Sequence, residues 1–244
     1  MIAIETKALT KYYKEILAVD ALDLSIEQGK LFALLGVNGA GKTTTIKMLS
    51  CLTKPTSGDA ILLGKSIVTN PEAVKEKISI SPQETAVAGS LSARENLELI
   101  AGIYGSDRRI AHSEANEMIS ALGLDEVANR KAKTLSGGMQ RRLSIAMALI
   151  SNPQILFLDE PTLGLDVFAR RELWAVIEKM KGKITIILTT HYMEEAEALS
   201  DRIGIMVKGK LTTVGTAEEL IAKTKTRNFE EAFIMLAKGS EAKQ

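Results

Sequence analysis

Short, mostly apolar runs recur along the chain and predict buried β-strands. Five such runs stand out, namely LFALL (31–35), ISIS (78–81), ILFL (155–158), ITIIL (184–188) and IGIMV (203–207). Runs of this length are typical of strands that are covered on both faces, as in a parallel sheet. Nearer the N-terminus, Leu22, Leu24 and Ile26 alternate with polar residues and predict a half-exposed antiparallel strand, and AILLGKSI (60–67) is compatible with another edge strand.

The middle of the chain, between about 85 and 150, has helical spacing and no expected strand. Three apolar stripes repeat at three- and four-residue intervals: Leu97, Ile100, Ala101 and Tyr104; Ala115, Met118, Ile119 and Leu122; Met139, Leu143, Ala146, Met147 and Ile150. Ser92 and Glu95 form a capping box before the first stripe, and Gly123 is placed to end the second helix. The pattern therefore predicts an α/β core that carries a helical insertion.

A helical tail is expected after this core. We predict one domain over residues 1–215, followed by a tail over 216–244 that begins with a capping box at Thr216 and Glu219. The tail has one apolar helical face, made of Phe229, Ala232, Phe233 and Leu236. Packing of this face against the protein's own core is favoured over a partner or regulatory contact, and the last residues, GSEAKQ (239–244), are expected to be disordered.

Composition and charge fit an ordinary globular protein of the reducing cytosol. Hydrophobic residues make up 45% of the 244 residues, charged residues make up 25%, and the net charge is +1. This balance gives no basic field for nucleic acid, so Arg108–Arg109 and Arg141–Arg142 are interpreted as solvated faces. Cys51 is the only cysteine, and no apolar run approaches the ~18 residues of a membrane helix. A signal-peptide pattern is absent, which makes a cytoplasmic location the expectation.

A phosphate-binding loop is the clearest chemical signal. GVNGAGKT, from Gly36 to Thr43, matches G-x-x-x-x-G-K-[ST] between a predicted strand and a predicted helix. Glycines let backbone N–H groups surround phosphates, while Lys42 reaches the β- and γ-phosphates and the Thr43 hydroxyl binds Mg²⁺. The residues expected to contact the nucleotide are Gly36, Val37, Asn38, Gly39, Ala40, Gly41, Lys42, Thr43 and Thr44.

Two carboxylates end one of the predicted buried strands, in ILFLDEPT. Asp159 is suited to hold Mg²⁺, and Glu160 could accept a proton from an attacking water. His191 and Gln83 also follow predicted strands, where they could reach the γ-phosphate and Mg²⁺, although each signal is weak by itself. The carboxyl edge of an open α/β sheet is where such proteins bind ligands.

A second glycine turn, TLSGGMQRR (134–142), has the form of an anion site at a helix start. It holds Ser136, Gly137 and Gly138 but no lysine. The phosphate loop some ninety residues earlier already forms a complete cradle, so the second turn needs a separate explanation.

These motifs, in this order, resemble the ATP-binding cassette (ABC) transporter ATPase family over roughly residues 2–215. The motifs that carry the resemblance are the phosphate loop, SPQ (81–83), LSGGMQ (135–140), ILFLDEP (155–161), GLD (164–166) and TTH (189–191). The resemblance implies a P-loop NTPase core with a mainly parallel sheet, an N-terminal antiparallel β subdomain and an inserted helical subdomain. It also implies that Gln83 contacts Mg²⁺ and water, that His191 contacts the γ-phosphate, and that Tyr13 stacks on adenine, with Tyr12 as the competing choice.

The family arrangement also explains the second turn. Two cassettes face each other head to tail, as a homodimer or with a closely related cassette, so that each ATP lies between one subunit's lysine loop and the other's signature. Ser136, Gly137, Gly138 and Asp166 would thus act in trans. The chain departs from the commonest pattern at Met139, which stands where glutamine usually follows the two glycines, and at Leu163, where serine is frequent. Neither change removes a group needed for hydrolysis.

The implied function is ATP hydrolysis, with ATP and Mg²⁺, for a transporter whose transmembrane permease is a separate subunit. Such a protein would lie on the cytoplasmic face of the membrane, and export of a drug or ion is weakly favoured. The alternative is a soluble ABC-type ATPase of translation or DNA repair, which usually has two cassettes or a long coiled-coil insertion. A GTPase is less favoured because no Asn-Lys-x-Asp segment exists.

Overall fold

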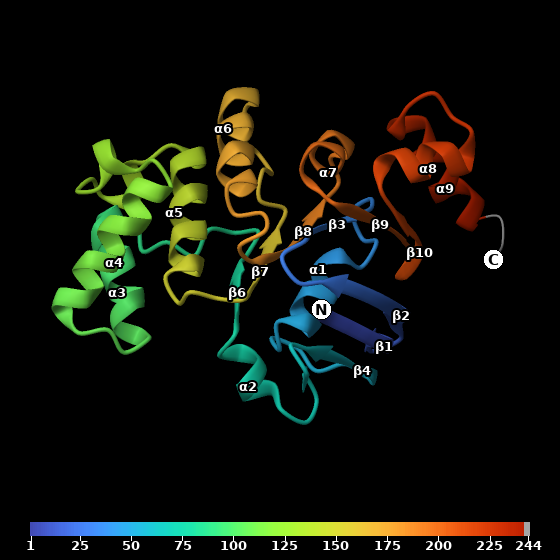
Figure 1. Cartoon of the computed structure of the whole chain (residues 1–244), viewed down its shortest axis with the longest axis horizontal. Helices are drawn as coiled ribbons and strands as arrows, with labels where there is room; N and C mark the ends of the chain where they lie inside the picture. Colours follow the sequence, from blue (N-terminus) through green and yellow to red (C-terminus); the bar gives the residue numbers. More distant parts are fainter. Residues whose placement is uncertain (242–244) are drawn as a thin grey trace.

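Two β-sheets form the body of the protein, which is described here by a computed structural model over residues 1–241 (Figure 1). The first is an antiparallel sheet of order β2-β1-β4-β5, and the second has the order β10-β9-β3-β8-β7-β6. In the second sheet only β10 runs antiparallel to its neighbour. The strands are β1 (Ile2–Tyr13), β2 (Ile16–Glu27), β3 (Leu31–Leu35), β4 (Ser57–Leu62), β5 (Lys65–Ser66), β6 (Ile78–Ser81), β7 (Ile155–Asp159), β8 (Thr185–Thr190), β9 (Arg202–Val207) and β10 (Lys210–Gly215).

The second sheet is covered on both faces, as its apolar strands predict. Alternate residues of β3 face opposite cores: Leu31, Ala33 and Leu35 pack with the helical insertion and the C-terminal helices. Phe32 and Leu34 pack with the antiparallel sheet and α1. A strand buried on both sides favours apolar residues on both faces, and β3, β7 and β8 are buried throughout. Their buried polar residues are Asp159, at the end of β7, and the threonines at the two ends of β8. The mainly parallel sheet and the separate antiparallel sheet are both confirmed.

The helices lie around this sheet and extend beyond it. They are α1 (Lys42–Leu49), α2 (Pro71–Lys75), α3 (Ala93–Ile103), α4 (Arg108–Ala121), α5 (Gly137–Leu149), α6 (Val167–Glu178), α7 (Met193–Leu199), α8 (Ala217–Thr224) and α9 (Phe229–Glu241), with short 3₁₀ turns at Asp125–Val127 and Ala132–Thr134. Figure 1 shows α3–α5 and α8–α9 at opposite ends of the molecule, with the parallel sheet between them. Within the described part of the chain, no helix has the length and apolar character needed to cross a membrane.

The presence of inserted helices is confirmed, and so are the expected caps. The Ser92 hydroxyl accepts a hydrogen bond from Glu95 N at 3.2 Å, and the Glu95 carboxylate accepts one from Ser92 N at 2.6 Å. These bonds and the neighbouring Lys131 lower the pKa of Glu95 to about 2. Gly123 has φ +61° directly after α4, the left-handed conformation that ends a helix.

The C-terminal tail packs on the core, as its apolar face predicts. Phe229 and Ala232 are buried, and Phe233 and Leu236 pack against the same cluster. The expected disorder of 239–244 is wrong for residues 239–241, because α9 continues to Glu241. Residues 242–244 lie outside the described residues.

Strands β1 and β10 and helix α6 were not anticipated from the pattern. Strand β1 breaks the period-two alternation because its pairing with β2 shifts register at several points, and Ala8 has φ +47°. Such bulges move successive side chains off the alternating faces, so the apolar signal is lost.

Candidate functional site

The phosphate loop and helix α1 form one wall of a cavity of about 390 Å³. Gly41, the N-cap of α1, has φ +102°, and a Cβ there would lie 2.4 Å from Ala18 O. A Cβ on Gly36 would lie 2.4 Å from Met206 O. Both positions therefore require glycine, which keeps the loop folded tightly over the start of the helix. The cavity is lined by Ile16, Leu17, Ala18, Asn38, Gly39, Ala40, Gly41, Lys42, Thr43, Thr44, Gln83, Glu160 and Leu163.

Lys42 is folded back into its own loop. Its Nζ donates to Gly36 O at 2.8 Å and Val37 O at 3.2 Å, and lies 3.2 Å from Glu160 Oε1. The side chain is only 4% exposed, so the ammonium is buried and fully partnered. A phosphate that binds Lys42 would therefore have to replace its present partners, the Glu160 carboxylate and the loop carbonyls.

The predicted metal-binding pair is brought together below the loop. Thr43 Oγ1 donates to Asp159 Oδ1 at 3.0 Å. The same carboxylate oxygen accepts from Thr189 Oγ1 at 2.6 Å, which fixes Asp159 at the end of β7. A hydroxyl and a carboxylate so arranged are hard oxygen donors of the kind that suits Mg²⁺.

Glu160 stands in a left-handed backbone conformation, with φ +46°. Non-glycine residues rarely adopt this conformation, and it concentrates at functional sites, where surrounding contacts hold it. Here Glu160 N donates to both the carbonyl and the hydroxyl oxygen of Thr189, at 3.1 and 3.0 Å. The side chain then contacts Lys42 through Oε1 and accepts a hydrogen bond from His191 Nδ1 at 2.8 Å through Oε2. His191 follows β8, the neighbour of β7 in the sheet.

Gln83 lines the cavity, and an arginine that was not predicted as a site residue holds its backbone. Arg141 donates to Pro82 O at 2.6 Å, to Gln83 O at 2.5 Å and to Glu160 O at 3.5 Å. It is 4% exposed, so its interpretation as part of a solvated face is wrong. Burial lowers the pKa of the guanidinium, against the raising effects of Asp159 and Glu195. This role of Arg141 could not be predicted from the sequence, because Pro82, Gln83 and Glu160 come close to Arg141 only in the folded protein.

The adjacent arginine is also engaged, whereas the other pair is solvated. Arg142 lies 3.4 Å from the Glu172 carboxylate and donates to the carbonyls of Leu122 and Gly123. Arg108 and Arg109 are exposed at the start of α4, as expected.

The second glycine turn lies at the N-terminus of α5 and faces solvent. Ser136 is the N-cap, and its hydroxyl accepts from Met139 N at 3.3 Å. Gly138 packs closely on α6, where a Cβ would lie 3.0 Å from the Cβ of Ala169. Asp166 is the exposed N-cap of α6 and accepts from Ala169 N at 2.9 Å. Neither Ser136 nor Asp166 lines the cavity formed by the described residues of the chain.

The candidate adenine-stacking residue lies beside this cavity but does not line it. Tyr13 and Tyr12 are 43% and 45% exposed, and they pair across the β1–β2 hairpin with the lining residues Ile16 and Leu17. Lys11 Nζ lies 5.2 Å from the centre of the Tyr13 ring. The choice of Tyr13 over Tyr12 therefore stays a prediction.

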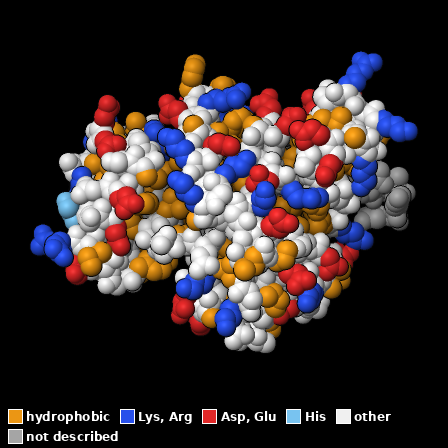
Figure 2. Space-filling view, in the orientation of Figure 1, with side chains coloured by type: hydrophobic (Ala, Val, Ile, Leu, Met, Phe, Trp, Pro, Cys, Tyr) orange, Lys and Arg blue, Asp and Glu red, His pale blue; other side chains and the backbone are white. Residues whose placement is uncertain are grey.

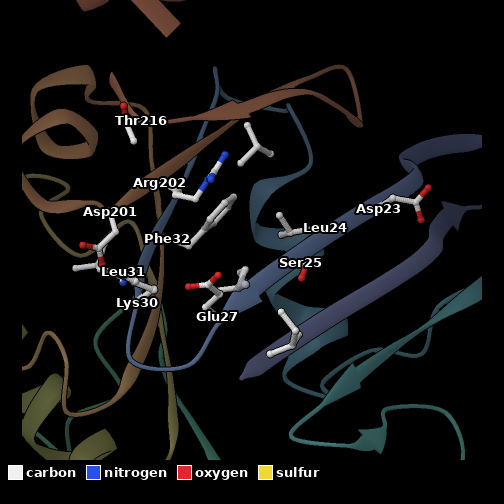
Figure 3. Close-up of a pocket in the computed structure, with 13 residues that line it drawn as sticks. Asp23, Leu24, Ser25, Glu27, Lys30, Leu31, Phe32, Asp201, Arg202 and Thr216 are labelled. Carbon is white, nitrogen blue, oxygen red and sulfur yellow. Dashed lines mark hydrogen bonds between the residues drawn. The ribbon is translucent and has the colours of Figure 1, made fainter. Parts of the chain in front are cut away.

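A second cavity, of about 440 Å³, lies between β2 and the starts of β3 and β9 (Figure 3). Phe32 and Leu24 are among its lining residues, and two of its charged lining residues, Asp201 and Arg202, contact other groups of the protein. Asp201 accepts from Leu31 N at 2.7 Å, and Arg202 lies 3.7 Å from the Glu219 carboxylate. The cavity has no glycine loop, and none of the predicted site residues lines it.

Curated relatives of the chain are ATP-binding proteins of transporters. It is 41% identical to the daunorubicin/doxorubicin resistance ATP-binding protein DrrA of Streptomyces peucetius over 89% of the chain and 66% of the relative. It is 38% identical to the probable multidrug ABC transporter ATP-binding protein YbhF of Escherichia coli over 96% of the chain and 41% of the relative. For DrrA3 of Streptomyces coeruleorubidus, the identity is 39% over 91% of the chain and 71% of the relative. The chain thus spans about two thirds of DrrA and less than half of YbhF.

Solved structures agree with these relatives. An ATP-binding subunit of an ABC transporter matches with a TM-score of 0.84 and 26% identity, over 96% of this chain and 99% of that chain. A dimeric ATP-binding cassette in a post-hydrolysis state with ADP and Pi matches with a TM-score of 0.79 and 28% identity, over 87% of this chain and 98% of that chain. The ABC transporter family model covers residues 19–163, more than half of the chain. The chain therefore belongs to the ABC transporter family, as an ATP-binding cassette.

Proposed function

We propose that the chain hydrolyses ATP at a site shared between two cassettes and that hydrolysis powers substrate movement through a separate membrane permease. The observation that supports this most strongly is the contact of one carboxylate, that of Glu160, with both Lys42 and His191 beside the glycine loop. Three groups needed for phosphoryl transfer thus share one set of contacts: a phosphate-binding cation, a base and a residue that positions the water.

Mg²⁺ fits the donors that are present. Thr43 and Asp159 would hold it, together with Gln83 from the cavity wall, and the ion would neutralise charge on the phosphates. ATP fits the tight glycine loop, whose backbone N–H groups and helix start favour phosphate.

Lys42 controls the proposed reaction through an exchange of partners. On leaving Glu160 for the β- and γ-phosphates, it frees Oε1 of that carboxylate to accept a proton from the attacking water. His191, donating through Nδ1 to Oε2, keeps the carboxylate oriented. As an imidazolium it would also donate from its other ring nitrogen to the γ-phosphate.

The signature turn would complete the site of a second cassette, either another copy of this chain or a closely related one. Ser136, Gly137 and Gly138 offer a hydroxyl, backbone N–H groups and a helix start, all at the surface. Asp166 is exposed as well and would cross the same interface. Phosphate charge is already balanced by Lys42 of the opposite subunit, which explains why this turn carries no lysine.

The helical insertion offers apolar surface for a permease. Large apolar side chains are exposed on α3, at its C-cap and on α4, namely Leu99, Ile103, Tyr104 and Ile110. Figure 2 shows apolar side chains among polar and charged ones over this end of the molecule. A cytoplasmic helix of the permease would dock here and hold the cassette on the cytoplasmic face of the membrane.

Export is favoured because relatives of the chain are named as drug-resistance and multidrug transporter proteins. These names also favour transport over a soluble ATPase of translation or DNA repair.

Phosphate release by the purified chain tests the proposal. Release is expected in ATP with Mg²⁺ and is expected to fall to background in EDTA or in the Lys42→Ala variant. A chain that binds ATP but releases no phosphate under any of these conditions contradicts the proposed hydrolysis.

A further inference from the structure

Glu195 is a buried carboxylate that the proposed hydrolysis does not use. It lies on α7, four residues after His191, and is 0% exposed. The other glutamates of this helix, Glu194 and Glu197, face solvent. A carboxylate is costly to bury, so its position calls for an explanation.

The groups around this carboxylate come from three segments of the candidate site. Trp174 Nε1, on α6, donates to Glu195 Oε1 at 3.0 Å. Thr190 ends β8 next to His191, and Thr162 lies in the turn after Glu160. Their hydroxyls and the charge of Arg170, on α6, lower the pKa of Glu195, but burial has the larger effect and raises it.

The polar contacts around Glu195 are incomplete. Among the buried side-chain atoms that have no hydrogen-bond partner within residues 1–241, three belong to this cluster: Glu195 Oε2, Thr162 Oγ1 and Arg170 Nε. The Thr162 hydroxyl nevertheless lowers the pKa of Glu195, so it lies close to this carboxylate. The three atoms belong to α7, to the turn after Glu160 and to α6, so the cluster joins three elements around one buried carboxylate.

We propose that Glu195 is a positioning residue that makes the His191 segment, the turn after Glu160 and helix α6 move as one unit. Asp166 is the N-cap of α6. This unit therefore connects the hydrolytic residues of one subunit to Asp166, the residue that the same subunit would contribute to the partner's ATP site. Glu195 thereby couples the two ATP sites of the dimer. The inference rests on the proposed function.

A second set of contacts, made by Tyr192, also connects the His191 segment to α6. The Tyr192 ring lies 4.1 Å from the His191 ring, and the Arg170 guanidinium lies 4.4 Å from the Tyr192 ring centre. A shift of His191 toward a γ-phosphate would therefore reach α6 through both Tyr192 and Glu195. Two packed contacts between the same elements favour discrete, joint movement over independent movement.

Glu195→Gln tests the coupling, because it keeps the shape and the Oε1 acceptor for Trp174 and removes the charge. The expected result is a kcat reduced by roughly 3- to 30-fold with an unchanged KM for ATP, and a Hill coefficient that falls toward one. Trp174→Phe, which removes the donor together with part of the buried ring, is expected to shift both quantities in the same direction. Glu194→Gln, on the exposed face of the same helix, is the matched control and is expected to behave as the parent.

Thermal stability separates this role from a purely structural one. Burial raises the pKa of Glu195 above its ordinary value of 4.5, so the parent loses stability as pH rises through the raised pKa. Glu195→Gln lacks this loss, and its Tm is therefore expected to match or exceed that of the parent at pH 8, with a smaller gain at pH 5.

The outcomes are distinguishable. A Glu195→Gln protein with parental kcat and Hill coefficient overturns the inference, as does one in which Tm and kcat fall together. If the parent itself releases no phosphate, the proposed function fails and the coupling fails with it.

Discussion

Replacing Glu160 with glutamine is expected to lower ATP turnover by roughly 10²–10⁴-fold, the usual contribution of a positioned general base. Glutamine has nearly the same shape, but its amide cannot accept the proton of the attacking water. Because Glu160 also holds Lys42 at 3.2 Å, its neutralisation frees the lysine for phosphate. ATP binding is therefore expected to persist at equal or higher affinity, and the closed dimer is expected to accumulate.

Phosphate release and ATP binding, measured on the same preparation, check this result, and size-exclusion chromatography with ATP detects the dimer. Glu197→Gln, an exposed charge removal on α7, is the matched control. Turnover of the Glu160→Gln protein near the parental rate would rule out Glu160 as the base.

Mixing two inactive variants is expected to restore hydrolysis. Lys42→Ala removes the phosphate-binding ammonium, and Ser136→Arg places a bulky side chain on the exposed signature turn, so each variant alone is expected to be inactive. A mixed dimer pairs the intact Lys42 of one subunit with the intact Ser136 of the other and contains one complete site. With random pairing at equal amounts, roughly a quarter of all sites are complete, which sets the expected recovery.

A titration of one variant into the other at constant total protein checks the recovery. Activity is expected to peak near equal amounts, because mixed dimers are most abundant there. A mixture that stays inactive at every ratio, while both variants still bind ATP or form dimers, contradicts the trans arrangement.

Sequence predicted best those features whose signal is local. The loop from Gly36 to Thr43 is a continuous motif that can be read directly, although the backbone atoms that exclude a Cβ at Gly36 and Gly41 belong to the distant Met206 and Ala18. The capping boxes at Ser92 and Thr216 are also local, and both form as predicted. Buried strands such as β3 were predicted because full burial on both faces leaves a continuous apolar run.

Features that depend on tertiary packing gave no such signal. Arg141 looks like any basic residue on a helix, yet it is buried because the Pro82–Gln83 segment and the Glu160 turn converge on it. Glu195 is one of three glutamates in a short acidic stretch, and only the fold distinguishes it from its exposed neighbours. Strand β1 was missed because bulges disrupt its alternation.

The specific activity of the purified chain across a dilution series tests the central claim most directly, that each ATP is hydrolysed between two cassettes. Mass action separates the subunits on dilution, so phosphate released per chain is expected to fall as concentration drops and to recover on reconcentration. A specific activity that stays constant, at concentrations where light scattering finds only single chains, would contradict the shared site.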